Sequence, residues 1–328
     1  TKNKSISGVA NRNFSLLGDP SMRLAIPEGQ VIISKINTKN NSDTLKALSM
    51  VQLKGEIHTN GEKNLNFNGT LHATLFDKET SLQTKGDENP VFPYSLWNNA
   101  LFRGEASIID GVFQLEFLLP KTIAYQIGNG KLSAYAHDVT NKTDASGGTV
   151  SFKIGESEDT LISDTAPPTI QLFMGDTTFI EGGVISSNSQ LVARLFDESG
   201  INVSNYGTGT TMVAILDDSK TYEVSEYFTA TKDNFTEGTL LFPIEGLEIG
   251  YHTLTLKVWD NLNNPATATI SFEVSESTEI IVLELSNYPN PFSESTIVRF
   301  IHTRPGEDLE VSLAIFTVTG QQVQTMNF

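Results

Sequence analysis

The stretch Gly250–Val274, GYHTLTLKVWDNLNNPATATISFEV, decides the fold class of this chain. Polar and apolar residues alternate from Tyr251 to Val258, turn-forming residues follow at Asp260–Pro265, and a second alternating run continues to the end of the stretch. Alternation with a period of two places every second side chain on one face of a strand, and Asn, Asp and Pro favour turns. The stretch therefore predicts a β-hairpin with one buried face.

A weaker copy of this pattern occurs earlier in the chain. The run Lys131–Asp138 leads through the polar residues Thr140–Gly148 into Thr149–Ile154, which predicts another closing hairpin. The sequence LVARLFD at Leu191–Asp197 also echoes LHATLFD at Leu71–Asp77. Repeats of this kind indicate domains built to one plan. We therefore expect an all-β chain of tandem immunoglobulin-like antiparallel β-sandwiches.

Composition excludes several classes of function. The chain has 328 residues and a net charge of −17, so phosphate backbones and anionic membrane surfaces are repelled, and no nucleic acid partner is expected. It contains no cysteine, which rules out disulfides, thiolate metal sites and a thiol nucleophile within it. No apolar run approaches the roughly 18 residues of a membrane-spanning helix, so no membrane span is predicted.

Turn clusters and composition divide the chain into five segments. Residues 1–27 are too few to build a core and read as the tail of an upstream domain, residues 28–155 as the first β-sandwich, and residues 156–168 as an acidic linker that ends in two prolines. Residues 169–275 form the expected second sandwich, and residues 280–328 the start of a third that lacks its closing hairpin. The chain begins at Thr1 without a charged-then-apolar leader, and we expect it to be a fragment of a longer protein.

The expected strands of the first sandwich are Val31–Ile36, Leu48–His58, Thr70–Phe76, Val91–Trp97, Leu101–Ile109, Val112–Leu119, Lys131–Asp138 and Thr149–Ile154. Those of the second are Thr169–Met174, Gln190–Asp197, Thr210–Leu216, Thr239–Ile244 and the hairpin at 250–274. Two more are expected near the C-terminus, at Thr296–Ile301 and Leu309–Thr317.

Acidic loops in the second sandwich are the candidate metal ligands. Asp197, Glu198, Asp217 and Asp218 supply oxygen atoms that a calcium ion could use. Their spacing matches no EF-hand loop, and acidic residues on a chain of this charge are commonly just solvated. We therefore expect no cofactor, with calcium as the alternative. Asp260 and Asn261 could join such a site, although local hydrogen bonds that fix the hairpin turn are the favoured role.

Other candidate residues have favoured structural roles. The glycine spacing that cradles phosphate is absent, and the five histidines, His58, His72, His137, His252 and His302, are scattered over the expected strands. Trp97 and Trp259 could be sugar-stacking platforms, but packing in a core or between domains is favoured. The loop from Ser199 to Gly209, which carries Tyr206, is the best candidate for an interaction loop, with a simple crossover equally compatible.

Several stretches resemble a known family. The segment NRNFSLLGDPSMRLA at Asn11–Ala25 resembles the closing segment of the gingipain-like cysteine peptidase domain. FDESGIN at Phe196–Asn202 and LKVWDNLNN at Leu256–Asn264 are similar to the region that follows the peptidase in PorU-like type IX secretion system sortases. SNYPNPFSESTIVRF at Ser286–Phe300 resembles the opening of the type IX C-terminal sorting domain, an immunoglobulin-like fold of proteins secreted by Bacteroidetes.

The resemblance implies a cell-surface enzyme that removes the sorting domain from secreted cargo and helps to attach that cargo to a surface glycolipid. The catalytic Cys and His of the family belong upstream of Thr1, so no catalytic residue is carried over to this chain. We expect a non-catalytic C-terminal region of such a sortase, at the extracellular face of the outer membrane. Its implied partners are its own upstream peptidase domain, type IX secretion components and cargo proteins.

An alternative is that the sandwiches belong to a type IX cargo protein, such as an adhesin or glycan-binding module. The peptidase-like segment at Asn11–Ala25 favours the sortase, because an adhesin has no need of it. Exposed edge strands of the incomplete third sandwich could also pair with a partner by strand addition. Asp-Thr pairs at Asp43, Asp159 and Asp164 resemble Bacteroidetes O-glycosylation acceptors.

Overall fold

The computed structural model describes residues 26–39, 42, 44–87, 90–158, 164–207, 209–275, 282–302, 309–317 and 319–328. In these residues the chain is all β, and the one helical element is a single 3₁₀ turn, η3 (Ser225–Tyr227). None of the described residues forms a helix long and apolar enough to cross a membrane. The predicted peptidase-like segment Asn11–Ala25 lies outside the described residues, as do Asp43 and Asp159.

The first unit is a sandwich that closes on itself around one core. Its main sheet has the order β8-β5-β11-β12-β1-β3-β4, and β9 pairs with both β3 and β8 and so joins the two ends. Leu53, Leu71 and Phe117 are among the side chains fully buried inside. The strands that form the main sheet are β1 (Gly29–Thr38), β3 (Met50–Thr59), β4 (Glu62–Lys63), β5 (Gly69–Phe76), β8 (Ala100–Ile109), β9 (Val112–Leu118), β11 (Lys131–Asp138) and β12 (Thr143–Thr149).

Smaller sheets flank the main one. A three-stranded sheet has the order β10-β13-β2, and β6 pairs with β7. These strands are β2 (Thr44–Ala47), β6 (Thr80–Gln83), β7 (Pro93–Leu96), β10 (Gly128–Asn129) and β13 (Lys153–Ser157). Strand β13 extends two residues into the segment predicted as a linker.

The structure corrects the predicted first hairpin. Strand β11 pairs with β12 at Thr143–Thr149, which the sequence had indicated as a polar loop, whereas Lys153–Ser157 joins a different sheet. The reason lies in the glycines that made this segment look like a loop. A Cβ at Gly147 would lie 2.1 Å from the carbonyl oxygen of Val31, and one at Gly148 would lie 2.3 Å from that of Leu132. Only glycine allows the neighbouring strands to approach so closely.

The second unit is a two-sheet sandwich, and the predicted hairpin at 250–274 is confirmed in it. Strands β21 (Gly250–Trp259) and β22 (Pro265–Val274) pair in register from Gly250↔Val274 to Trp259↔Pro265. Leu254, Leu256 and Val258 are fully buried on one face of β21. One sheet has the order β14-β16-β20-β19 and the other β15-β22-β21-β17-β18. The remaining strands are β14 (Thr169–Met174), β15 (Val184–Ile185), β16 (Ser189–Phe196), β17 (Val213–Leu216), β18 (Lys220–Glu223), β19 (Phe228–Ala230) and β20 (Glu237–Ile244).

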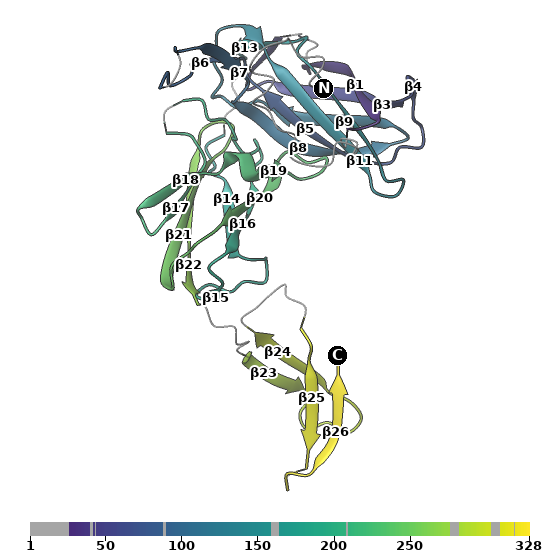
Figure 1. The fold of residues 1–328 in the computed structure, drawn as a ribbon, viewed down its shortest axis with the longest axis vertical. Helices are drawn as coiled ribbons and strands as arrows, with labels where there is room; N and C mark the ends of the chain where they lie inside the picture. Colours follow the sequence, from purple (N-terminus) through teal and green to yellow (C-terminus); the bar gives the residue numbers. More distant parts are fainter. Residues whose placement is uncertain are drawn as a thin grey trace, which may run out of the picture.

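The two sandwiches are joined through their sheets, and Figure 1 shows β19 lying against β8 at the join. The connection is one parallel bridge between Ala230 of β19 and Gly104 of β8. A Cβ at Gly104 would meet the Phe102 ring at 2.4 Å and the Ala230 Cβ at 3.2 Å, so the close approach of the two strands needs a glycine there. The two sheets therefore form one continuous surface across the domain boundary.

The C-terminal residues form two separate hairpins, β23 (Val282–Tyr288) with β24 (Ile297–His302), and β25 (Ser312–Phe316) with β26 (Gln322–Asn327). The strands predicted near 296–301 and 309–317 coincide with β24 and β25. Large apolar side chains on these hairpins are exposed, among them Leu285, Tyr288, Phe292, Ile297, Phe316 and Val323.

Candidate functional site

The largest concentration of buried polar residues lies where the two sandwiches meet. The second sandwich contributes the segment after β16, from Asp197 to Asn205, and the β21–β22 turn at Asp260–Asn264. The first contributes the residues that precede β8 and follow β9. The two loops of the second sandwich overlap the stretches FDESGIN and LKVWDNLNN that carry the family resemblance. We call this set of loops the interdomain junction.

Asn261 is the central residue of the interdomain junction. Its backbone amide donates to the Gly200 carbonyl at 3.0 Å, and its side-chain Nδ2 donates to the carbonyl oxygens of Ser199 at 2.8 Å and Leu118 at 3.1 Å. The backbone carbonyl oxygen of Asn261 accepts a hydrogen bond from the backbone amide of Lys121 at 2.7 Å. Leu118 and Lys121 belong to the first sandwich, so one buried side chain fixes the turn, the FDESGIN loop and the neighbouring domain together.

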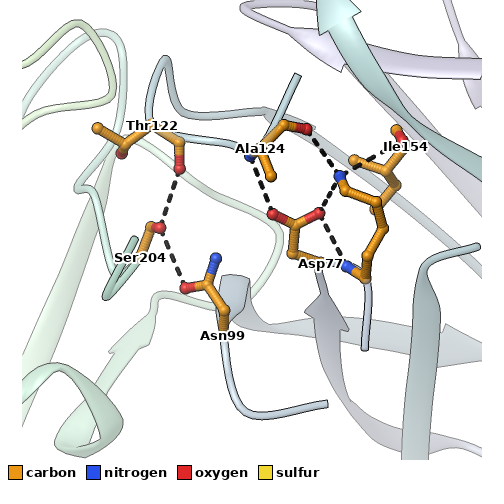
Figure 2. A network of polar contacts seen from close by, with 7 residues as sticks. Asp77, Asn99, Thr122, Ala124, Ile154 and Ser204 are labelled. Atoms are coloured by element: carbon orange, nitrogen blue, oxygen red, sulfur yellow. Dashed lines mark hydrogen bonds and ion pairs between the residues drawn. The ribbon is translucent and has the colours of Figure 1, made fainter. Parts of the chain in front are cut away.

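A second contact runs through Ser204, and Figure 2 shows this hydroxyl between Asn99 and Thr122 of the first sandwich. The Ser204 hydroxyl lies 3.1 Å from Asn99 Oδ1 and 3.0 Å from the Thr122 carbonyl oxygen. Asn202 adds a bond from Nδ2 to the Thr122 hydroxyl at 2.8 Å. All these groups are buried or half-buried, where a polar group without a partner is costly. The bonds therefore specify one arrangement of the two domains.

The loop after β9 is itself held in place by a buried ion pair. Asp77 accepts from the backbone amide of Ala124 at 3.2 Å, and the ammonium of Lys78 contacts Asp77, the Ala124 carbonyl at 2.8 Å and the Ile154 carbonyl at 3.4 Å (Figure 2). Asp77 is 3% exposed, so this carboxylate is sheltered from water. The pair orients the Thr122–Ala124 segment that Ser204 and Asn202 bind.

Three carboxylates lie close together beside the interdomain junction. Oxygen atoms of Asp164, Asp197 and Asp260 lie within 4.8 Å of one another, and they form a group of possible metal ligands among the described residues. Burial raises the pKa of Asp197 and of Asp260, and the neighbouring carboxylates add to both shifts. Hydrogen bonds from Ser199 to Asp197 and from Asn264 to Asp260 oppose them. This arrangement can hold a proton or a cation.

The four residues predicted as calcium ligands do not form one site. Asp197 lies in the carboxylate group, and the adjacent Glu198 is exposed. Asp217 and Asp218 form the β17–β18 turn, where Asp217 accepts from His252 Nδ1 at 2.7 Å and from the Thr253 backbone amide at 3.0 Å. Sequence spacing missed Asp164, because this residue reaches the group only through the fold.

The Asx role of the hairpin turn is confirmed for Asp260, whose Oδ1 accepts from the backbone amides of Leu262 at 3.0 Å and Asn264 at 2.6 Å. Trp97 and Trp259 are half-buried, and the Lys131 ammonium lies 5.1 Å from the centre of the Trp97 ring. In the candidate interaction loop Ser199–Gly209, residues 199–204 are buried against the first sandwich. Tyr206 is exposed beyond it.

A small cavity of about 160 Å³ also lies between the domains. Arg103 lines it from β8, with Asn205 and Glu226 opposite. Burial lowers the pKa of the Arg103 guanidinium, which Glu226 partly offsets. No motif singled out Asn99 or Arg103, because isolated polar residues carry no such signal, whereas Asn202 and Ser204 lie in the candidate interaction loop Ser199–Gly209.

The chain is similar to several proteins of known structure. No protein-family model and no curated protein matches the chain. Among solved structures, dimeric latent PorU from Porphyromonas gingivalis is 32% identical, over 95% of this chain and 30% of that one, with a TM-score of 0.44. The chain is similar to PorU along nearly all of its length. It spans 30% of the length of that protein.

Two other solved structures are similar at much lower identity. Fibronectin(III)-like modules of Clostridium thermocellum CbhA are 10% identical, over 75% of this chain and 94% of that one, with a TM-score of 0.22. A tetra-tandem repeat from the extending region of a large adhesion protein is 13% identical, over 92% of this chain and 62% of that one, with a TM-score of 0.21.

Proposed function

We propose that this chain is the non-catalytic C-terminal region of a PorU-like type IX secretion system sortase, and that its sandwiches are a docking arm. The arm holds the upstream peptidase domain, secretion components and cargo in fixed positions at the extracellular face of the outer membrane. The sequence motifs and the 32% identity with PorU support the family assignment. The absence of cysteine from the sequence supports a role outside the chemical step.

One observation carries the proposal: Asn261 is buried at the domain boundary and bonded to both sandwiches. A turn residue in an independent module would face water, and its side chain would serve only its own turn. Here the side chain secures a neighbouring domain, and the shared sheet at Gly104 and Ala230 adds a second connection. An arm that keeps its two domains in one orientation can present a large composite surface without ordering it on binding.

Binding of the purified chain to candidate partners tests the proposal. The peptidase domain of a PorU-like sortase and an isolated type IX sorting domain would be titrated separately by biolayer interferometry. We expect saturable binding to at least one of them. Asn261→Leu, which uncouples the domains, should weaken it at least tenfold, whereas Asn129→Ala on the exposed edge should leave it unchanged. Absence of binding to both partners would overturn the docking role.

The adhesin alternative makes a different prediction. A glycan-binding sandwich uses exposed aromatic platforms, whereas Trp97 is half-buried under Lys131 and Trp259 lies half-buried at the end of β21. We therefore expect no binding to a glycan array. Selective glycan binding that is lost in Trp97→Ala or Trp259→Ala would favour the adhesin.

A further inference from the structure

An outward face of the first sandwich gathers two histidines and a glutamate that no turn or core explains. His72 of β5 lies opposite Glu105 of β8 and opposite Tyr135 of β11, and His137 follows Tyr135 by two residues on the same face of β11. Residues opposite one another, or two apart on a strand, point to the same side of a sheet. The alternate residues Leu71, Ala73, Ala134 and Ala136 are buried, which places the histidines on the outer face.

The two imidazoles meet through ring nitrogens. His72 Nε2 lies 3.2 Å from His137 Nδ1, and the ring centres are 5.1 Å apart with an interplanar angle of 19°. Two nitrogen ligands of a tetrahedral Zn²⁺ ion, each about 2.0–2.1 Å from the metal, are separated by about 3.4 Å. The two nitrogens form a hydrogen bond in this structure, and their spacing is close to one edge of a zinc coordination sphere, so that a zinc ion would replace the shared proton.

Glu105 supplies the orientation that a metal-binding histidine needs. Its Oε1 lies 3.2 Å from His72 Nδ1, on the side of the ring away from His137. A carboxylate that accepts the Nδ1 proton leaves Nε2 unprotonated and aimed at the metal, the usual arrangement behind histidine ligands. The other two carboxylate-paired histidines, His58 and His252, have no second imidazole beside them in the described structure.

We propose that His72 and His137 bind one Zn²⁺ ion through Nε2 and Nδ1 respectively, with Glu105 as the positioning residue and water at the remaining coordination positions. Neutral imidazole suits zinc, whereas calcium requires several oxygen ligands that this face does not converge on one point. The His72 side chain is 42% exposed, so solvent and ions reach the site directly. The acidic chain, with a net charge of −17, concentrates cations at its surface.

Isothermal titration calorimetry of the full chain with ZnCl₂ in a non-coordinating buffer tests this site. We expect one equivalent of zinc bound with micromolar affinity and no corresponding heat with CaCl₂. His72→Ala and His137→Ala should each weaken zinc binding at least tenfold, and Glu105→Gln by about tenfold, as loss of an orienting carboxylate does elsewhere. The matched controls His58→Ala and His252→Ala should bind as the wild type does.

Two further measurements test whether zinc binds at these two histidines and not elsewhere on the chain. Nitrogen-15 NMR of the histidine rings should show zinc shifting Nε2 of His72 and Nδ1 of His137 specifically. Asp197→Asn should not alter zinc affinity, which separates this site from the carboxylate group. Zinc affinity unchanged in His72→Ala, zinc shifts spread equally over all histidines, or absence of zinc binding would each overturn the proposal.

Discussion

Asn261 in the β21–β22 turn donates its Nδ2 to the Leu118 carbonyl at the end of β9, 143 residues away in the sequence. The same nitrogen bonds Ser199 in its own domain, so both hydrogens of the amide are used. A hairpin turn that would otherwise be solvated is thereby converted into the contact that orients one sandwich on the other. The stability of each domain should consequently depend on its neighbour.

Asn261→Ala should therefore destabilise both sandwiches. The substitution leaves the Leu118 and Ser199 carbonyls buried without this donor, at a cost of about 2 kcal/mol. We also expect the wild type to unfold in one urea transition and the variant in two, because the domains of the variant lose their coupling. Tryptophan fluorescence and circular dichroism would follow the two domains, and Asn129→Ala is the exposed control. Coincident transitions with wild-type midpoint would contradict this prediction.

Asp77→Asn should be more damaging than its position in a loop suggests. Asp77 faces the Lys78 ammonium, whose side chain is only 16% exposed, so the substitution leaves a largely buried cation without its counterion. Removing one partner of such a pair costs about 3–5 kcal/mol. Urea unfolding measures the loss. Asp77→Asn/Lys78→Met, which removes both charges, should recover most of it, and equal losses in the two variants would argue against the ion pair.

The strands that could be predicted from the sequence are those in which polar and apolar residues alternate strictly. Alternation located β14 to the residue and most of β5, β8, β16, β21 and β22, because strict in–out patterning is imposed by a half-buried sheet. It missed β12, whose glycines meet neighbouring backbone, and short strands such as β15 and β19, whose two or three residues carry no period. The family motifs pointed to the stretches that build the interdomain junction. They did not reveal its partners, since Leu118, Lys121 and Asn99 are brought there only by tertiary packing.

Repeated sequence also hid a difference in chemistry. Asp77 and Asp197 occupy the same place in the echo LHATLFD and LVARLFD. Asp77 is neutralised by the adjacent Lys78, whereas Asp197 is followed by Glu198 and faces the carboxylates of Asp164 and Asp260. The pattern of a strand is preserved between the two domains, while the charge balance at its end is reversed.

The Asp217–His252 pair should contribute stability within a limited pH range. Burial would lower the pKa of His252, but hydrogen bonds from it to Asp217 and the Glu248 carbonyl raise it overall. Burial would raise the pKa of Asp217, but the hydrogen bonds that it accepts from Thr253 and His252 lower this pKa overall. The histidine contribution is present below its unfolded pKa of about 6.5 and is lost as pH rises through the raised value. The aspartate contribution is lost as pH falls through its lowered value.

Stability should thus decline by about 0.5–1 kcal/mol above neutral pH, the size expected for a partly exposed ion pair. Urea unfolding of wild type and His252→Gln between pH 5 and pH 9 measures it. The difference between the two proteins should be largest at pH 5 and smallest at pH 9. A difference independent of pH would show that the ring packs without being charged.

Asp197→Asn should stabilise the protein at neutral pH. The retained Oδ1 still accepts from the Ser199 amide and hydroxyl, which lie at 2.8 Å and 2.6 Å in the wild type, while one of three crowded charges disappears. Relief of this repulsion is worth on the order of 3 kcal/mol for each pair of unit charges at an effective dielectric constant near 20. Because the pKa of Asp197 is raised, the wild type regains this stability as pH falls and the carboxylate takes up its proton. The gain of the variant should therefore shrink from pH 7.5 to pH 4.5.

Urea unfolding in the presence of EDTA measures that gain without metal, and Asp218→Asn in the exposed β17–β18 turn is the control, with no change expected. A variant less stable than the wild type in EDTA would mean that repulsion is not the dominant effect of Asp197. Repeating the series in calcium chloride tests the calcium prediction for this residue. A calcium-dependent gain in the wild type that Asp197→Asn abolishes would assign the ion to the carboxylate group, because oxygen ligands must converge to hold it. Equal calcium responses in the two proteins would exclude Asp197 as a ligand.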